Sequence, residues 1–340
     1  MNIVLLFSIL ILSLLLNYLL IKKKLFLNFR GDKHQKFTSS GNIPLSGGLI
    51  LIFTSYFYLN LINFIFVILI FLLGFLSDIK KFNSPKLRFI IQTLIVLIVV
   101  YFSSITVPQT KIIFLDLLLK NNIFRIIFSI FCILIIINGY NFIDGVNTSL
   151  IGYCLIVSLS LNYLNKNNID ISQIIYFHNF IPVLLALFIL NFFNKLYLGD
   201  GGAYFLGLLF ALCLINTYQI NNLISPYFIA CLLWYPAFEN LFSILRKKNF
   251  TQSPLKPDTN HLHQIIFLYL KKNFNIKSDY LNTTTGMIIN FYNLISIGIA
   301  TNFYNHTKIQ ILIILFNVTI YIFFYRKLLT KKTILKFHKK

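Results

Sequence analysis

The chain has 340 residues, of which 57% are hydrophobic and only 11% are charged. A soluble domain of this length does not need so much apolar sequence, and apolar runs long enough to cross a bilayer recur from end to end. The composition therefore excludes an ordinary soluble protein and predicts an all-α, polytopic membrane protein.

Eleven membrane-spanning helices are predicted. In chain order they cover residues 3–21, 43–60, 61–77, 88–107, 122–140, 148–164, 173–193, 202–218, 223–244, 285–303 and 308–326. We do not expect the first to be a cleaved signal peptide, because no basic residue precedes it and no small-residue cleavage site follows. A single membrane domain is expected over 1–326, followed by a basic cytoplasmic tail over 327–340.

The basic residues predict the orientation. With the N-terminus outside, 25 of the 30 Lys and Arg fall in the inside loops and the C-terminal tail. Positive residues mark the cytoplasmic side, so the N-terminus is expected outside and the C-terminus inside. The net charge of +21 suits contact with anionic lipid head groups, and its scatter over several loops argues against nucleic-acid binding.

Four of the nine Asp and Glu residues lie in short polar motifs at the ends of predicted helices. They are Asp78, Asp144, Asp200 and Asp258. The predicted orientation brings all four to the cytoplasmic face, although the motifs played no part in setting it. Acids kept at membrane-helix ends beside Gly, Asn and His indicate a metal and phosphate site.

Two of these motifs have clear competing interpretations. Asn138, Asn141, Asp144 and Asn147 are three residues apart, so on a helix they would line one side and could bind phosphate, ribose or a metal; the alternative is plain helix capping. Gly199-Asp200-Gly201-Gly202 would let the backbone approach a ligand, with Asp200 holding Mg²⁺; the alternative is a capped turn.

The other motifs contain basic residues. Asp78 precedes a run that includes Lys86 and Arg88, which suits a metal ligand beside phosphate-binding cations but also a loop that only sets topology. His261 and His263 are two apart, so in an extended loop both rings could face a diphosphate; the alternative is two solvated histidines. Lys33 lies just before the second predicted span, where Gly47-Gly48 permits close packing or contact with a lipid phosphate.

Together and in this order, these motifs resemble the polyprenyl-phosphate N-acetylhexosamine-1-phosphate transferases of glycosyltransferase family 4. Their superfamily includes the phospho-N-acetylmuramoyl-pentapeptide transferase. The matching stretches are His34-Gln35 with 44–48, then 74–88, 138–147, 191–207 and 258–263. The chain departs from the family pattern at Ser77, where the family usually has a second aspartate, and at Asn147, Ala203, Thr259 and Gln264.

The resemblance implies a Mg²⁺-dependent enzyme, with Mn²⁺ as an alternative metal, in a bacterial inner membrane. It would transfer N-acetylhexosamine-1-phosphate from a UDP-sugar to undecaprenyl or another polyprenyl phosphate and release UMP. This step would initiate an envelope glycan such as O-antigen, other lipopolysaccharide or a cell-wall polymer. The alternative is an inactive relative that binds prenyl lipid or acts as a scaffold.

The same resemblance implies roles for individual residues. Asp200 would be the metal ligand, Asp144 and Asn141 would bind the nucleotide or position the metal, and Asp78 would orient the lipid phosphate or a metal-bound water. His261 and His263 would hold the diphosphate. The remaining substrate-binding candidates are Asn138, Asn147, Asp258, Lys33, Lys86 and Arg88.

A transporter is disfavoured, because Glu239 is the single acid inside a predicted span and lies toward its cytoplasmic end. The sequence leaves open which N-acetylhexosamine is used, which glycan is built and whether the protein forms a homodimer.

Overall fold

A computed structural model describes residues 3–27, 43–82, 84–172, 174–175, 177–249 and 260–337. These residues form fourteen helices, and their extended pairing is limited to an isolated bridge between Leu27 and Pro44. The helices are α1 (Ile3–Lys22), α2 (Gly47–Ser55), α3 (Leu61–Asp78), α4 (Pro85–Ser103), α5 (Ile113–Leu119), α6 (Asn122–Ile143), α7 (Ser149–Lys166), α8 (Phe177–Phe192), α9 (Gly199–Ile220), α10 (Pro226–Leu232), α11 (Trp234–Asn249), α12 (Leu262–Asn273), α13 (Ser278–Asn302) and α14 (Thr307–Phe337). The all-α prediction is confirmed.

Several helices begin at signals that are visible in the sequence. The Asn60 side chain accepts a hydrogen bond from the Asn63 N–H at the start of α3, and Asn121 does the same at the start of α6. Ser84 followed by Pro85 begins α4, and Ser225 followed by Pro226 begins α10. Each cap satisfies a backbone N–H that has no partner within its helix, so polar residues between apolar runs set the helix boundaries.

Six of the helices in the described ranges are long and apolar enough to cross a membrane, and a seventh span results if α10 and α11 are taken together. The six are Val4–Lys22, Leu61–Asp78, Pro85–Ser103, Asn122–Ile143, Gly199–Ile220 and Thr307–Thr330. The structure thus supports a multi-pass membrane protein. Each of the eleven predicted spans contains a helix, but the count of eleven and the orientation of the termini stay predictions.

Two predicted spans differ from the structure. Residues 43–60 contain only the nine-residue α2, and nine residues rise about 14 Å against a hydrocarbon core of about 30 Å. Residues 223–244 are predicted as one span, and the structure divides this stretch into α10 and α11, which meet at a bend of 76°. Both differences have the same cause. Hydropathy predicts the length of an apolar run, but it does not predict where a helix within that run ends or bends.

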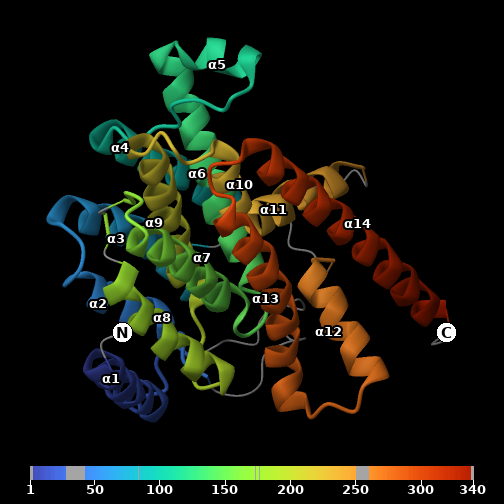
Figure 1. Ribbon diagram of the computed structural model, residues 1–340. Helices are drawn as coiled ribbons and strands as arrows, with labels where there is room; N and C mark the ends of the chain where they lie inside the picture. The colour runs from blue at the N-terminus through green and yellow to red at the C-terminus, as the bar shows by residue number, and fades with distance from the viewer. Residues whose placement is uncertain are drawn as a thin grey trace.

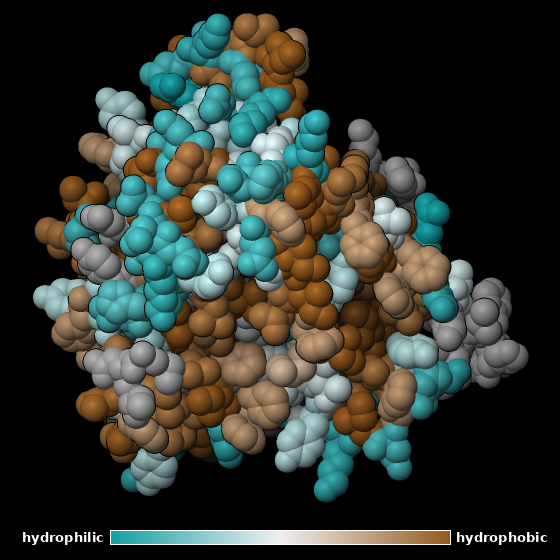
Figure 2. Space-filling model, viewed as in Figure 1, coloured by the Kyte–Doolittle hydropathy of each residue, from teal (hydrophilic) through white to brown (hydrophobic). Residues whose placement is uncertain are grey.

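Helix α9 lies at the centre of the bundle and packs chiefly against α3 and α6 (Figure 1). In its apolar window 83% of residues are buried, against 17% in α14 and 22% in α4. The peripheral helices instead leave large apolar side chains exposed, and Figure 2 shows broad apolar surface on this face. Such exposure is typical of a surface in contact with lipid.

Close backbone contacts seat the N-terminus of α9. A Cβ at Gly74 of α3 would lie 2.6 Å from the backbone of Asp200, so only glycine allows this approach. The N–H groups of Gly47 and Gly48 donate to the carbonyls of Tyr197 and Leu198, immediately before α9. The expected role of Gly47-Gly48 in close packing is confirmed, and α2 and α3 both pack against the turn that carries Asp200.

Candidate active site

Asp78 caps the N-terminus of α9 from the end of α3. Its Oδ1 accepts from the Asp200 N–H at 2.9 Å, and its Oδ2 accepts from the Gly201 N–H at 3.1 Å. Gly199 makes the turn with a φ of +77°, and a Cβ there would lie 2.7 Å from Asp78 Oδ2. Because a carboxylate is favourable beside the positive end of a helix dipole, Asp78 holds the turn that presents Asp200.

The Asp200 carboxylate lies where three elements meet. Its Oδ1 accepts from Asn141 Nδ2 at 2.8 Å, and its Oδ2 accepts from the Ser77 hydroxyl at 2.9 Å. Arg88 of α4 forms an ion pair with the same oxygen at 3.1 Å and also donates to the Ser77 hydroxyl. The Asp200 side chain is still one-third exposed, so a ligand can reach it.

Asp144 follows the last residue of α6 and is half-buried beside the other two acids. Burial raises the pKa of its carboxyl well above the usual value, and the charges of Asp200 and Asp78 add to this shift. No hydrogen bond joins this carboxylate to any residue of the described chain. An acid repelled by two neighbouring acids is stabilised in its ionised form by a bound cation.

The row of four polar residues expected at 138–147 does not form, because α6 ends at Ile143. Asn138 donates to Gln92 Oε1 at 3.1 Å and to the Leu134 carbonyl. Asn147 lies beyond the helix and is buried, where it donates to the Asn191 carbonyl at 2.8 Å and to Asn194. The structure therefore brings only Asn141 and Asp144 of this set to Asp200, and substrate binding by Asn138 and Asn147 stays a prediction.

The contacts of Asn147 also explain its departure from the family pattern. Its amide donates to a backbone carbonyl, and Asn282 Nδ2 donates to its Oδ1 at 3.0 Å. An ionised aspartate at this position could accept the second bond but could not donate the first. Asparagine is thus matched to the asparagines that surround it.

The histidine motif joins the same site from the other side. His263 is buried, and a Cβ on Gly145 would lie 2.0 Å from its Nε2, so the ring lies directly against the turn after Asp144. The rings of His261 and His263 are stacked, with centroids 5.7 Å apart and planes within 6°. The His261 ring lies 5.1 Å from that of Phe142. The histidine motif therefore lies beside the turn that carries Asp144, and contact of both rings with a diphosphate stays a prediction.

The remaining predicted residues lie apart or outside the described ranges. Lys86 is exposed on α4 and makes no hydrogen bond or ion pair with a described residue. Lys33 and Asp258 fall in 28–42 and 250–259, which are outside the described residues.

Sequence reasoning missed two charged residues near the histidines. Lys247 of α11 is buried with its Nζ 5.9 Å from the centre of the Phe142 ring, in a cation–π arrangement. Glu239 of the same helix is fully buried beside His261. Lys247 lies in a basic run whose sequence indicates only membrane topology. Glu239 could have been recognised as a candidate site residue, because a single acid in an apolar span is often functional.

No three His, Cys, Asp or Glu side chains within the described ranges come close enough to form a metal-binding cluster on their own. Magnesium usually binds proteins through one or two carboxylates, with water and substrate phosphate completing its ligands. Asp200 and Asp144 fit that pattern, because one is partly exposed and the other makes no hydrogen bond to a described side chain.

Comparison with known proteins agrees with this arrangement. The profile of glycosyl transferase family 4 matches residues 60–218, which include Asp78, Asp144 and Asp200. The chain is thus similar to this family over that stretch, in agreement with the resemblance of its motifs.

Individual relatives are more specific. The chain is 23% identical to undecaprenyl-phosphate alpha-N-acetylglucosaminyl 1-phosphate transferase of Escherichia coli K12, over 88% of this chain and 82% of that protein. It is 30% identical to decaprenyl-phosphate N-acetylglucosaminephosphotransferase of Mycolicibacterium smegmatis, over 38% of this chain and 37% of that protein. It is also 27% identical to a probable undecaprenyl-phosphate N-acetylglucosaminyl 1-phosphate transferase of Bacillus subtilis, over 59% and 56%.

Proposed function

We propose that this protein transfers N-acetylglucosamine-1-phosphate, or a closely related N-acetylhexosamine-1-phosphate, from a UDP-sugar to undecaprenyl or another polyprenyl phosphate. UMP is the second product, and the lipid-linked sugar begins an envelope glycan. The observation that carries the proposal is the meeting of Asp78, Asp144, Asp200 and the two histidines at one site, in a chain whose residues 60–218 match the glycosyl transferase family 4 profile.

In the proposed reaction, an oxygen of the lipid phosphate forms a bond to the sugar-linked phosphorus, and the bond from that phosphorus to UMP breaks. Asp200 and Asp144 would hold Mg²⁺, which supplies positive charge to the diphosphate of the donor. Arg88 can neutralise phosphate charge because it already lies beside Asp200 at 3.1 Å. His261 and His263 would contact the diphosphate from the side of α12.

Ser77 is compatible with activity. Its hydroxyl cannot act as a base at neutral pH, but a phosphate monoester with a second pKa of about 6 is already largely dianionic there. Ser77 instead donates to Asp200 and accepts from Arg88. The alternative of an inactive relative has less support, because the other acids and both histidines are present and brought together.

The proposed location is a bacterial inner membrane, with this site on the cytoplasmic face where UDP-sugars are available. The charge distribution supports it, since 25 of the 30 Lys and Arg fall on the predicted side of the membrane that also carries the three aspartates.

The test is transfer by purified protein in detergent with undecaprenyl phosphate and a panel of radiolabelled UDP-sugars. We expect lipid-linked label and UMP with UDP-N-acetylglucosamine or another UDP-N-acetylhexosamine, dependence on Mg²⁺, and loss of both products with EDTA. Lys120 is exposed on the predicted outer side of the membrane, so the Lys120→Ala variant is the matched control for changes in surface charge and should retain most activity. Absence of lipid-linked label from every donor, with folded protein, would refute the proposal.

A further inference from the structure

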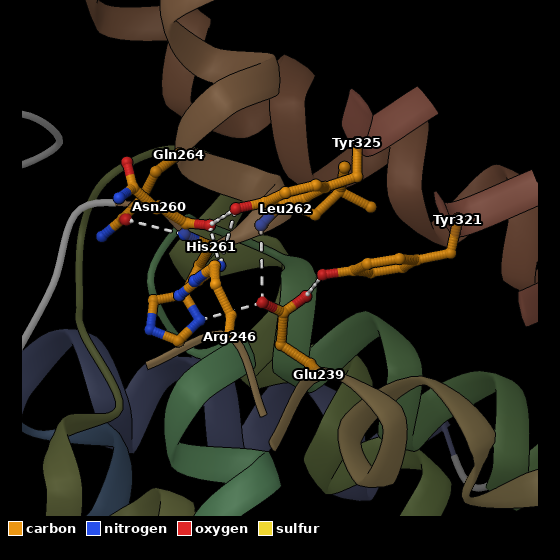
Figure 3. Close-up of polar contacts among 8 residues, drawn as sticks. All are labelled: Glu239, Arg246, Asn260, His261, Leu262, Gln264, Tyr321 and Tyr325. Carbon is orange, nitrogen blue, oxygen red and sulfur yellow. Dashed lines mark hydrogen bonds and ion pairs between the residues drawn. The ribbon is translucent and has the colours of Figure 1, made fainter. Parts of the chain in front are cut away.

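A fully buried carboxylate, that of Glu239, lies beside the His261 ring (Figure 3). Glu239 belongs to α11, the second half of the bent helix pair. Its Oε1 lies 2.9 Å from His261 Nδ1 and accepts from the Leu262 N–H at 3.4 Å, and its Oε2 accepts from the Tyr321 hydroxyl at 2.7 Å. Both carboxylate oxygens are therefore directed at the start of α12 and at α14.

Such a group is costly to bury unless it is paired and hydrogen-bonded. The chain has only nine acids, and apolar residues of similar volume would fill this position in an apolar bundle without that cost. The described contacts of Glu239 converge on the histidine motif and on the helix that braces it. This pattern indicates that the acid is directed at His261.

The contact determines how the imidazole is held. A carboxylate only accepts hydrogen bonds, so Nδ1 of His261 must carry the proton in this pair. Nε2 then lies across the ring from Glu239, and the face of the ring packs against Phe142 and His263 at 5.1 and 5.7 Å. The tautomer and the plane of the ring are both fixed by neighbours, as for histidines held by a carboxylate in other sites.

Helix α14 completes the support. Tyr325 donates to the Asn260 carbonyl at 3.1 Å, and Arg246 donates to that carbonyl and to the Tyr325 hydroxyl (Figure 3). The Tyr321 and Tyr325 rings stack with centroids 6.0 Å apart. Helix α14 thus contacts both Asn260, which precedes His261, and Glu239, which pairs with His261.

We propose that Glu239 is a positioning residue of the active site, which holds His261 as the Nδ1–H tautomer with Nε2 directed toward the substrate diphosphate. The inference rests on the proposed transferase function. It assigns the acid a role through His261 and adds α14 to the elements that organise the site. A purely structural ion pair is the competing explanation, and it predicts that the melting temperature and the activity fall together in every variant of Glu239 and Tyr321.

The test is a double-variant cycle of Glu239→Gln and His261→Asn, with initial transfer rates measured at saturating donor. Glutamine keeps the shape and one acceptor oxygen but removes the charge. We expect Glu239→Gln to lower kcat by roughly 10–100-fold in the wild-type background. In the His261→Asn background the same change should lower the rate less than about twofold, because the histidine through which it acts is gone.

Two controls separate positioning from folding. Tyr321→Phe removes one hydrogen bond to Glu239 without touching His261, so it should lower kcat much less than Glu239→Gln. Glu239→Asp keeps the charge and should recover part of the rate lost in Glu239→Gln. A merely structural role would instead lower the melting temperature in proportion to activity in all three variants.

Nitrogen-15 NMR of histidine-labelled protein gives a readout that does not depend on turnover. The His261 signal, assigned by its loss in His261→Asn, should show a protonated Nδ1 in wild type. Equal rate losses in both backgrounds, or an unprotonated Nδ1 in wild type, would overturn the inference. Failure of wild type to transfer any sugar would instead refute the proposed function and leave the NMR result to decide the contact.

Discussion

Replacing Asp78 with asparagine tests whether this carboxylate holds the turn that presents Asp200. In the structure it accepts from the N–H groups of Asp200 and Gly201 at 2.9 and 3.1 Å. A hydrogen bond to a charged group contributes about 1.5–3 kcal/mol, and asparagine keeps only one acceptor oxygen while its NH₂ would face an N–H donor.

The expected loss for Asp78→Asn is about 2 kcal/mol of unfolding free energy, since one charge-assisted bond is removed and the other is weakened. In a chain of 340 residues, a change of this size lowers the melting temperature by roughly 3 °C. Transfer should fall as well, because Asp200 follows the turn. Melting in detergent and radiolabelled transfer, measured on the same preparations, test both expectations.

Asp116→Asn is the matched control. Asp116 lies in the first turn of α5, far from the site, and accepts hydrogen bonds from the N–H of Thr110 at 2.6 Å and from its hydroxyl at 2.8 Å. The Asp116→Asn variant should lower the melting temperature without a specific loss of transfer activity. If Asp78→Asn abolished transfer while the melting temperature stayed within about 1 °C of wild type, Asp78 would act on a substrate and not as a cap, and the reasoning would be refuted.

Four further predictions follow from the site. Asp200→Asn should abolish transfer while the protein stays folded; near-normal turnover would leave Asp144 as the metal ligand to test. The Ser77→Asp variant should change the transfer rate only modestly, because the phosphate nucleophile is already ionised at neutral pH. The wild-type rate should rise through about pH 6 and then level off. An inactive wild type that Ser77→Asp makes active would mean that an added base is essential. The pKa of Asp144 is raised in the folded state, so the stabilising contribution of this carboxyl group is present below about pH 4 and is lost as the pH rises through the folded pKa. The Asp144→Asn variant should therefore have a higher melting temperature than wild type at pH 7.5 without Mg²⁺, and the difference should close when Mg²⁺ is added. Identical melting temperatures at every pH would contradict this prediction. Cysteines introduced within 108–121 should react with an impermeant reagent from outside and those within 250–265 should not; the reverse result would separate the histidines from cytoplasmic UDP-sugars.

Hydropathy and charge were enough to predict a helical membrane protein and the positions of most of its helices, although α5 and α12 fall outside the predicted spans. Each predicted span contains a helix because apolar length and polar caps are local properties of the chain. The sequence also identified Asp78, Asp144, Asp200, His261 and His263 as one set, because polar groups at the ends of apolar helices are visible without knowing what they contact.

The contacts of these groups could not be predicted from the sequence, because they depend on how distant helices pack. Asp78 contacts backbone groups 122 and 123 residues away, so nothing near it in the chain identifies it as a cap. Asn147 leaves the expected row because α6 ends at Ile143, and its partners come from later helices. Glu239 looked like an isolated acid in a span, and it became a partner of His261 only when the bend between α10 and α11 and the packing of α14 brought their side chains together. Hydropathy and spacing depend on neighbours in the chain, whereas hydrogen-bond partners depend on how distant helices pack.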